Sequence, residues 1–432
     1  MKELEYPFDA AYIIKKRKSL KKALLADGTS RIRKKIAVFG GSTTSDIVKT
    51  LELFLLDAGI EPEFYESEYA QYFQDAMFPD ETLLSFKPDI VFIHTTNRNV
   101  TNWPEMTDTA EQIDEKLHTE LNRFTAMWKS IAEKFHCPII QNNFEMPLYR
   151  LLGSRDAWDI HGRTNFLTRL NEAFYAYARE NESFYIHDLN FVSADYGLKE
   201  WSNPLFWNMY KYAMCFEAIP SFAFSVSHII KSIFGKNKKA LALDLDNTLW
   251  GGVVGDDGVD GIEIGQETGV SQSYYEFQTY VKQLKSLGIV LTVCSKNDHE
   301  NAIAGLNHPE GALRPDDFVI IKANWENKDR NIAETAAELN ILPDSIVFAD
   351  DNPAEREIVR TQIKGAAVPD MDGVENYITT IDRSGFFEVT TFSEDDLKRN
   401  EMYKKNALRA AEMASFGDYN DYLKSLEMHA VI

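Results

Sequence analysis

Short apolar runs alternate with longer amphipathic stretches along most of the chain, and this alternation limits the fold more than any other feature. In the first half, Pro88–His94 gives the strongest strand signal, and Glu111–Phe135 and Thr164–Glu180 have helical spacing. Strands that alternate with helices of this length form parallel sheets with right-handed crossovers. The sequence therefore predicts an α/β fold. The other strands expected in this half are Ile36–Phe39, Glu63–Tyr65, Pro138–Gln141 and Phe184–Leu189.

The second half shows the same alternation after a glycine- and lysine-containing stretch at 235–239. Taken together, the two halves predict two parallel-sheet, three-layer α/β/α domains of the Rossmannoid or flavodoxin-like kind. The strands expected here are Ala240–Leu243, Val290–Cys294, Phe318–Ile321 and Ser345–Ala349, and the helices are Ser271–Leu287, Asp298–Leu306, Lys328–Leu339 and Ala354–Thr361.

The domain boundaries follow from these patterns and from the length of 432 residues, which suggests two or three domains. We expect a basic N-terminal helix and linker over 1–34, an α/β domain over 35–203, a helical connector over 204–238, a second α/β domain over 239–390 and a C-terminal helical tail over 391–432.

The charge of the chain limits its partners. Lys and Arg number 46 and Asp and Glu 67, so the formal net charge is −21. A chain this acidic is a poor global binder of nucleic acid or anionic membrane. Basic residues concentrate in one window, because Lys15–Lys35 holds ten of them and a single acid, Asp27. Such a run usually forms a solvated helix face, and the alternative is a docking patch for an acidic partner.

The cysteines and the apolar runs bear on localisation. Cys137, Cys215 and Cys294 stand far apart and form no CxxC motif. This pattern excludes a disulfide framework and a thiolate zinc site, and it suits a reducing cytosol. The sequence after Met1 is not a secretory signal, and no apolar run approaches the ~18–20 residues of a membrane span. We therefore expect a cytoplasmic protein with no membrane span.

Two carboxylates follow the expected strand Ala240–Leu243. Asp244 and Asp246 stand two residues apart, and such residues point to the same side of a strand. Ligands of open α/β sheets bind beyond the carboxyl ends of the strands. Two carboxylates this close repel each other unless a cation lies between them or one is protonated. The pair indicates metal-assisted chemistry in which one carboxylate attacks and the other handles a proton; the alternative is a pair of helix-capping residues.

Polar side chains follow other expected elements in a way that weakens the capping alternative. Ser295 follows the strand Val290–Cys294, and Asp350 and Asp351 follow another strand. Lys328 begins a helix, where the helix dipole disfavours a cation. A single pair of acidic residues is common in proteins. A chain that supplies two carboxylates, a hydroxyl, a lysine and two more carboxylates in this order is not.

These four segments resemble the motif set of the haloacid dehalogenase (HAD) superfamily. The sequence around them resembles the FkbH-like branch of that superfamily. The resemblance runs from about Lys35 to Leu426 and is strongest over 240–360. It implies that 239–390 is a HAD-like catalytic domain. The segments that carry the branch resemblance are Asp244–Gly252, Gly255–Gly258, Cys294–Asp298 and Phe348–Glu355.

The resemblance implies a role for each acidic residue. Asp244 resembles the nucleophile that forms an aspartyl-phosphate, and Asp246 resembles the general acid/base. Asp350 and Asp351 would complete a Mg²⁺ site with Asp244 and the backbone carbonyl of Asp246. Carboxylate oxygens, phosphate and water are ligands that suit Mg²⁺. The residues expected to contact the phosphorylated substrate are Asn247, Thr248, Ser295, Lys296, Asn297 and Lys328.

The spacing of these residues predicts a capless core. Asp246 and Ser295 are 49 residues apart, and Ser295 and Asp350 are 55 apart. The core elements and a short flap near Gly251–Gly265 fill these gaps, which leaves no room for a large cap domain. An open site of this kind acts on a macromolecule, or another domain encloses its substrate.

The segment 35–203 resembles the SGNH-hydrolase fold that precedes the catalytic domain in this branch. Ser42 stands where that fold places its nucleophile, and Asn97 or Asn99 where it places an oxyanion-hole asparagine. However, none of the nine histidines has an Asp three residues before it, so the Asp-x-x-His motif of that fold is absent. We therefore expect a scaffold that shields or recognises substrate, with ester hydrolysis at a second site as the alternative.

The resemblance implies a Mg²⁺-dependent phosphatase or phosphotransferase. FkbH-like proteins take the glyceryl unit of 1,3-bisphosphoglycerate, release phosphate and load an acyl carrier protein. Acyl carrier proteins are acidic, so the acidity of the chain opposes their binding unless they bind at a local basic patch such as Lys15–Lys35. One alternative is a phosphatase acting on a phosphorylated sugar or acyl intermediate of polysaccharide synthesis. Another is an inactive scaffold that binds partners. Cys215 is the better candidate for an acyl-carrying thiol, because Cys294 on a core strand is expected to be a packing residue.

Overall fold

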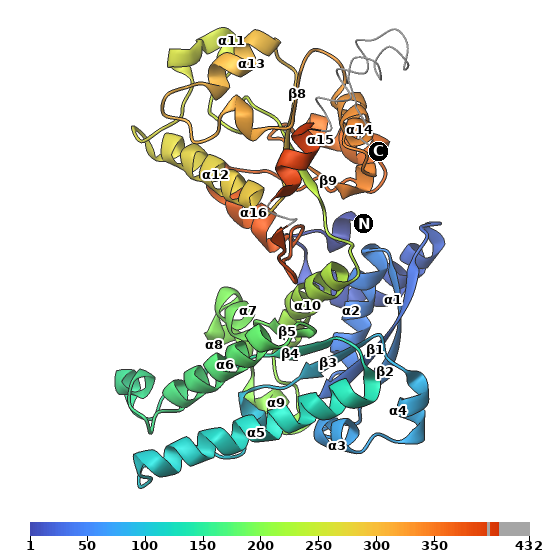
Figure 1. The fold of residues 1–432 in the computed structure, drawn as a ribbon, viewed down its shortest axis with the longest axis vertical. Helices are drawn as coiled ribbons and strands as arrows, with labels where there is room; N and C mark the ends of the chain where they lie inside the picture. Colours follow the sequence, from blue (N-terminus) through green and yellow to red (C-terminus); the bar gives the residue numbers. More distant parts are fainter. Residues whose placement is uncertain (395–397, 406–432) are drawn as a thin grey trace, which may run out of the picture. The chain divides into compact units, whose positions relative to one another are not determined.

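The computed structural model describes residues 1–394 and 398–405, so most of the predicted C-terminal tail lies outside the described residues. The chain forms two compact units that divide between Lys236 and Asn237 (Figure 1). Within the described part, no helix has the length and apolar character needed to cross a membrane.

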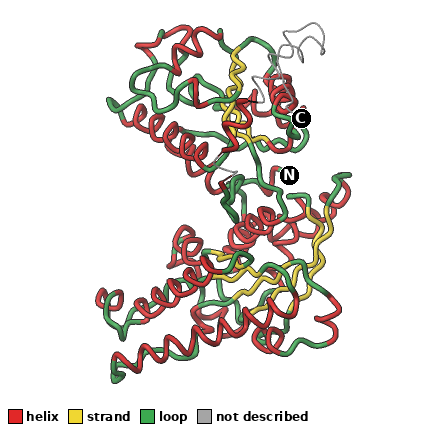
Figure 2. Tube along the Cα trace, in the orientation of Figure 1, coloured by secondary structure: helices red, strands yellow, loops and turns green. Residues whose placement is uncertain are grey.

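The first unit is built on a five-stranded parallel sheet with strand order β2-β1-β3-β4-β5, drawn in yellow in Figure 2. The neighbouring strands β1 and β3 end together, because Gly40 lies opposite His94. The strands are β1 (Ile32–Gly40), β2 (Ile60–Glu66), β3 (Ile90–His94), β4 (Ile139–Asn142) and β5 (Phe184–His187).

Helices cover both faces of this sheet, because both sets of alternating strand residues are apolar. Ile36 and Val38 of β1 pack with one group of helices, and Ala37 and Phe39 pack with another. The first group is α1 (Ala10–Ala26), α2 (Ser45–Asp57) and α10 (Ile219–Ile233), and the second is α3 (Tyr72–Met77), α5 (Ala110–Phe135) and α6 (Arg163–Glu180). The remaining helices of the unit are α4 (Glu81–Phe86), α7 (Leu189–Tyr196), α8 (Leu198–Trp201) and α9 (Pro204–Tyr210).

The segment before residue 35, predicted as a basic helix and linker, is packed into the first unit. Ile13, Leu20 and Leu24 lie on one side of α1 and are buried against α2 and α10. The run of lysines masks this apolar stripe in the sequence. The predicted connector likewise forms part of this unit, because α10 supplies one of the helices that cover the sheet.

The second unit is built on a four-stranded parallel sheet with strand order β8-β7-β6-β9. Its strands are β6 (Ala240–Leu243), β7 (Val290–Ser295), β8 (Ile320–Ala323) and β9 (Ile346–Ala349). The fully buried β6 lies in the middle, which is typical of parallel strands covered on both faces.

Alternating residues of β6 again divide between two cores. Leu241 and Leu243 pack with α12 (Gly269–Ser286) and α16 (Tyr377–Arg383), whereas Ala240 and Ala242 pack with α14 (Lys328–Glu338) and α15 (Pro353–Gln362). The crossover from β6 to β7 holds only the short α11 (Val254–Asp257), a 3-10 turn and α12, and that from β7 to β8 holds α13 (His299–Leu306). The two parallel three-layer units confirm the predicted α/β fold class and its capless core.

Candidate active site

The strand order of the second unit brings three of the four predicted segments to one edge of the sheet. The central strand β6 pairs with β7 on one side and with β9 on the other, and Leu243 lies opposite both Val293 and Ala349. Asp244 follows β6, Asp350 follows β9, and Ser295 ends β7, so their side chains leave the sheet at neighbouring carboxyl ends.

A buried lysine bridges two of these carboxylates. The Nζ atom of Lys328 lies 3.0 Å from Oδ1 of Asp244 and 2.5 Å from Oδ2 of Asp350. The lysine side chain is 4% exposed, so this ion pair is shielded from water. Lys328 is the first residue of α14, and its ammonium group is held by two carboxylates despite the unfavourable helix dipole.

Three carboxylates gather around this lysine. Asp244, Asp350 and Asp351 each offer an oxygen atom, and these atoms lie within 4.8 Å of one another. Burial raises the pKa of Asp350 and of Asp351, and the nearby charge of Asp244 raises both further. Burial alone would lower the pKa of Lys328, but the carboxylates of Asp244 and Asp350 outweigh this effect and hold its pKa above the ordinary value. The cluster thus carries more negative charge than one lysine neutralises.

Asp246 is held apart from this cluster by its own donors. Its Oδ1 atom accepts hydrogen bonds from Nε1 of Trp250 at 2.9 Å and from the backbone N–H of Val254 at 3.0 Å. Its Oδ2 atom accepts from Nδ2 of Asn297 at 2.9 Å. Burial raises the pKa of Asp246, and the hydrogen bonds from Val254 and Trp250 oppose that effect. The carboxyl group that the sequence assigns to proton transfer is therefore fixed in orientation.

Two residues predicted to contact substrate have other contacts in the structure. The Oγ1 atom of Thr248 accepts a 3.1 Å hydrogen bond from the backbone N–H of Asp351 and lies 3.4 Å from its Oδ1 atom. The Oδ1 atom of Asn247 accepts from the backbone N–H of Gly252 at 3.0 Å. Asn297 likewise contacts Asp246, as described above. These side chains position the acidic residues and the flap that follows β6.

The turn after β6 is fixed by two tyrosines. Asn247 has a positive φ of 57°, a conformation that asparagine tolerates better than most residues. Its carbonyl oxygen accepts hydrogen bonds from the hydroxyl of Tyr274 at 3.3 Å and from that of Tyr377 at 3.1 Å. The backbone between Asp246 and Thr248 is therefore anchored to α12 and α16.

Ser295, predicted to hold phosphoryl oxygens, has a buried hydroxyl group without a hydrogen-bond partner within the described residues. It is 1% exposed, and its Oγ atom makes no hydrogen bond among the described residues. The neighbouring Lys296 is paired with Glu355 at 2.6 Å. Cys294 faces the core, and burial raises the pKa of its thiol, so it is not an acyl carrier of the ordinary thiolate kind.

Two supporting residues were missed in the sequence. Trp250 is 1% exposed and packs against α13, where a Cβ atom on Gly305 would come within 2.8 Å of its ring. Arg356 on α15 is 4% exposed and donates to the carbonyl oxygens of Asp350 at 2.9 Å and of Asp351 at 2.7 Å. The only sequence signal for either was proximity, because each follows an acidic pair by four or five residues.

The residues present fit a hard divalent cation and a phosphoryl group. Three carboxylates with oxygen atoms this close, on two adjacent strand ends, form a donor set of the kind that Mg²⁺ prefers. The partnerless hydroxyl of Ser295 and the ammonium group of Lys328 supply donors for anionic oxygens at the same edge. The arrangement can neutralise a phosphate ester and present a carboxylate to its phosphorus atom.

The residues proposed as a second site lie at the carboxyl edge of the first sheet, but no base contacts Ser42. Ser42 is 1% exposed, and its Oγ atom has no hydrogen-bond partner within the described ranges. Asn99 donates from Nδ2 to the carbonyl oxygen of Gly41 at 2.9 Å, and Asn97 donates to that of Glu145 at 3.4 Å. Both amides therefore hold the loops around the serine.

His187 and Asp188, which are consecutive in the sequence, have other partners than Ser42. Nε2 of His187 pairs with Oγ of Ser225 at 3.0 Å, and Asp188 accepts the backbone N–H of Phe191 at 3.1 Å as the N-cap of α7. Cys215 is also a poor nucleophile, because burial raises the pKa of its thiol. The geometry gives no activated nucleophile in this part of the molecule.

Comparison with known families and structures agrees with this picture. A family model described as the FkbH N-terminal domain matches residues 35–231. The chain is also similar to a crystal structure of the N-terminal part of the protein BF1531 from Bacteroides fragilis, which contains a phosphatase domain and is complexed with Mg. The identity is 31%, the TM-score is 0.78, and the match covers 87% of this chain and 99% of that chain.

Other similarities are much weaker. A candidate acylhydrolase from Bacteroides fragilis, BF3764, is 16% identical with a TM-score of 0.29, and the match covers 51% of this chain and 97% of that chain. A comparison with curated proteins gave no match.

Proposed function

Because the chain belongs to the FkbH-like branch of the HAD superfamily, we propose that it is a Mg²⁺-dependent phosphatase or phosphotransferase that works through an aspartyl-phosphate on Asp244. The observation that carries the proposal is the buried contact of Lys328 with Asp244 and Asp350, 3.0 and 2.5 Å long, beside a third carboxylate. A lysine and a cation site together offset the repulsion between a carboxylate nucleophile and an anionic substrate.

In the first step, an oxygen atom of Asp244 attacks the phosphorus atom of the substrate. A new P–O bond forms to Asp244, and the bond from phosphorus to the leaving oxygen breaks. Asp246 in its protonated form gives its proton to that leaving oxygen. Trp250 and Asn297 hold the Asp246 carboxyl in place for this transfer.

In the second step, water or another acceptor attacks the phosphorus atom of the aspartyl-phosphate. Asp246, now ionised, accepts the proton of the attacking group, and the bond from phosphorus to Asp244 breaks. This restores both carboxyl groups. Lys328 and Ser295 hold the non-bridging oxygens, for which the partnerless Oγ atom of Ser295 is suited.

Asp244, Asp350 and Asp351, with the backbone carbonyl of Asp246, would hold Mg²⁺, which when bound neutralises charge on the phosphoryl oxygens. Thr248 positions Asp351, and Arg356 positions the backbone of Asp350 and Asp351. Ligating carboxylates require such support to keep their geometry.

The substrate that the family resemblance favours is 1,3-bisphosphoglycerate, with an acyl carrier protein as acceptor. Two phosphates must then leave. The ester phosphate would be hydrolysed through Asp244, and the acyl phosphate would be displaced when the carrier thiol attacks the carbonyl carbon. A capless site suits a protein acceptor, because no inserted domain lies over the carboxyl ends of β6 and β7 within the described residues.

The test is phosphate release from 1,3-bisphosphoglycerate with Mg²⁺, with and without a phosphopantetheinylated carrier protein. Asp244→Asn serves as the blank for hydrolysis of the ester phosphate, and mass spectrometry of the carrier is the readout. A glyceryl adduct is the expected result. Phosphate release without an adduct would support a phosphatase for another phosphorylated intermediate, such as one of polysaccharide synthesis. Full activity in Asp244→Asn would show that Asp244 is not the nucleophile. If no phosphate ester were turned over, the protein would instead be an inactive scaffold that binds partners.

A further inference from the structure

Helix α1 carries a concentration of positive charge in an otherwise acidic protein. It contains six basic residues and no acidic residue, although the net charge of the chain is −21. Two of the six are paired with α2: Arg17 lies 2.6 Å from Asp46, and Lys21 lies 2.7 Å from Glu52. The side of α1 that faces α2 is therefore neutralised.

The other four basic residues of α1 are exposed and make no ion pair among the described residues; they are Lys15, Lys16, Lys18 and Lys22. Three of them, Lys15, Lys18 and Lys22, follow the i, i+3, i+7 spacing that places side chains on one helix face. We call these three residues with Leu25 the α1 stripe. Lys18, Lys21, Lys22, Leu25 and Ala26 line a hollow there.

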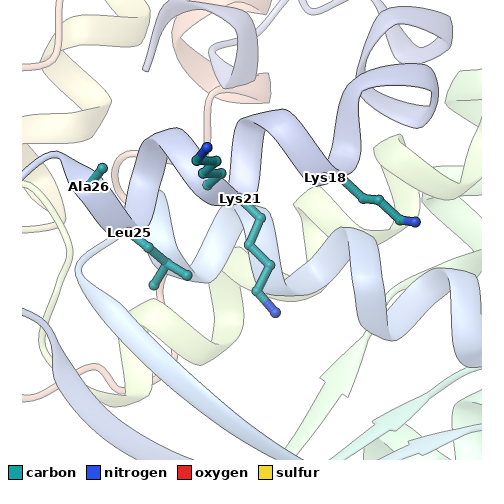
Figure 3. A pocket seen from close by; sticks show the side chains of 5 residues that line it. Lys18, Lys21, Leu25 and Ala26 are labelled. Carbon is teal, nitrogen blue, oxygen red and sulfur yellow. The ribbon is translucent and has the colours of Figure 1, made fainter.

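Figure 3 shows the side chains of Lys18 and Lys21 extending away from the helix, with Leu25 and Ala26 further along it. Leu25 is 52% exposed, so the basic stripe ends in an accessible apolar side chain. Protein-binding surfaces combine an apolar centre with a polar, solvent-accessible rim.

The structure argues against a membrane as the occupant of this surface. A helix that lies in a membrane interface inserts an apolar face. The apolar residues Ile13, Leu20 and Leu24 of α1 are instead buried against α2 and α10. Long polyanions such as nucleic acid would meet the net negative charge of the remaining chain within a few Debye lengths. A compact acidic protein surface that covers only the stripe avoids both difficulties.

We propose that the α1 stripe is a docking surface for an acidic protein, and, resting on the proposed function, that this protein is the carrier that accepts the transferred group. Opposite charges of this kind mainly accelerate encounter and fix orientation, and they act strongly at low salt. The stripe removes the conflict between an acidic enzyme and an acidic carrier. Docking here is independent of the chemistry at Asp244.

The test measures binding of a fluorescently labelled, phosphopantetheinylated acyl carrier protein to the full chain by anisotropy, at low and physiological salt. The variant Lys15→Glu/Lys18→Glu/Lys22→Glu reverses the stripe. The matched control, Lys129→Glu/Lys199→Glu/Lys364→Glu, reverses three exposed lysines elsewhere that have no ion pair within the described ranges. Circular dichroism and phosphate release from a small phosphate ester establish that each variant is folded.

The stripe variant is expected to bind the carrier at least tenfold more weakly, with the control and Asp244→Asn within twofold of the unsubstituted chain. Raising the salt concentration should weaken carrier binding by the control variant. It should hardly change carrier binding by the stripe variant. Equal binding by both triple variants, or no carrier binding at all, would overturn the proposal. The proposal would also be overturned if the α1 stripe were needed for binding phosphatidylserine vesicles, or for self-association of the chain, and not for binding the carrier. Stripe-dependent carrier binding without any phosphate release would refute the proposed chemistry while leaving the docking surface standing.

Discussion

Nε1 of Trp250 donates a 2.9 Å hydrogen bond to Oδ1 of Asp246. The same Oδ1 atom accepts the backbone N–H of Val254, so the flap after β6 is attached to the carboxyl group at two points. The indole is buried and packs against α13 at Gly305. Trp250 thus links Asp246, the proposed proton-transferring residue, to the body of the second unit without contacting Asp244, the proposed nucleophile.

Trp250→Phe should lower kcat more than it changes KM. The phenyl ring keeps the packing but removes the donor, so Asp246 loses one of the contacts that fix its orientation. A hydrogen bond to a charged group contributes ~1.5–3 kcal/mol, so we expect kcat for a phosphate ester to fall about tenfold or more. The measurement is steady-state phosphate release at saturating Mg²⁺.

Trp128→Phe is the matched control for this change. Trp128 is also fully buried, and its Nε1 atom donates to Oε1 of Gln141 at 3.0 Å in the first unit. This variant should lose stability but keep kcat. Equal losses of kcat in the two variants would mean that Trp250 acts through general stability rather than through Asp246.

Thr248→Val should weaken Mg²⁺ binding. The variant removes the Oγ1 atom that contacts the backbone and side chain of Asp351, while the shape of the side chain is retained. Loss of a residue that positions a metal ligand typically costs 10–100-fold in affinity. We expect the Mg²⁺ concentration for half-maximal phosphate release to rise roughly tenfold. Isothermal calorimetry gives the same quantity without turnover.

The chain offers Thr292→Val as a control for this substitution. Thr292 lies on β7 in the same sheet, is fully buried, and its hydroxyl has no hydrogen-bond partner within the described residues. Its replacement should leave the Mg²⁺ dependence unchanged. A comparable shift in both variants would argue that any change in sheet packing, rather than the contact with Asp351, alters the cation site.

Lys328→Met should make stability depend on Mg²⁺. Without the ammonium group, the buried carboxylates of Asp244 and Asp350 face each other uncompensated. Removing one partner of a buried ion pair typically costs about 3–5 kcal/mol. We expect a thermal midpoint several degrees lower without Mg²⁺, recovered in part as Mg²⁺ is added, and almost no phosphate release at any concentration.

Lys322→Met tests whether this effect belongs to the buried site. Lys322 pairs with Glu334 and Glu338, whose side chains are 45% and 46% exposed. Pairs with exposed partners contribute about 0–1 kcal/mol, so this variant should be nearly as stable as the unsubstituted chain. If Mg²⁺ stabilised both variants equally, the cation would bind elsewhere.

The strand ends of the candidate site were predictable from sequence because they depend on local pattern. Each apolar run ends at a polar residue, and parallel strands bring the residues that follow them to the carboxyl edge of the sheet. Asp244, Ser295 and Asp350 all lie where this rule puts them. The catalytic roles assigned to these three residues stay predictions.

The contacts of Asn297, Thr248 and Trp250 could not be predicted in the same way. Asn297 donates to a carboxylate 51 positions away, and Thr248 contacts a residue 103 positions away. Such partners depend on strand register and on the path of the flap. The packing of α1 against the first unit was not predicted either. Its run of lysines indicates a solvated helix, although three spaced apolar residues of α1 are buried.

Three histidines are buried together in the first unit. His94, His187 and His228 are 0%, 1% and 7% exposed. Burial lowers the pKa of His94 to about 4 and that of His187 to about 3, and it lowers the pKa of His228 well below its ordinary value. Each imidazole is therefore neutral in the folded protein at pH 7.

These histidines should destabilise the first unit in mild acid. The unfolded chain binds protons near pH 6.5 and the folded unit does not, so stability is present above that pH and is lost as the pH falls toward about 4. Each histidine contributes ~1.4 kcal/mol per pH unit below 6.5, or roughly 2 kcal/mol by pH 5. Glu145 acts in the opposite direction, because burial raises its pKa to about 8.

His228→Phe isolates one of these contributions. The Nε2 atom of His228 has no hydrogen-bond partner among the described residues, and a phenyl ring can keep the edge contact with Phe224, whose centroid lies 4.3 Å away. As the pH falls below 6, the variant should become more stable than the unsubstituted chain. Its relative free energy of unfolding should rise by ~1.4 kcal/mol for each pH unit. Urea unfolding of the first unit between pH 7.5 and 5 measures it. A pH-independent difference for His228→Phe would show that this imidazole is protonated in the folded protein as readily as in the unfolded chain.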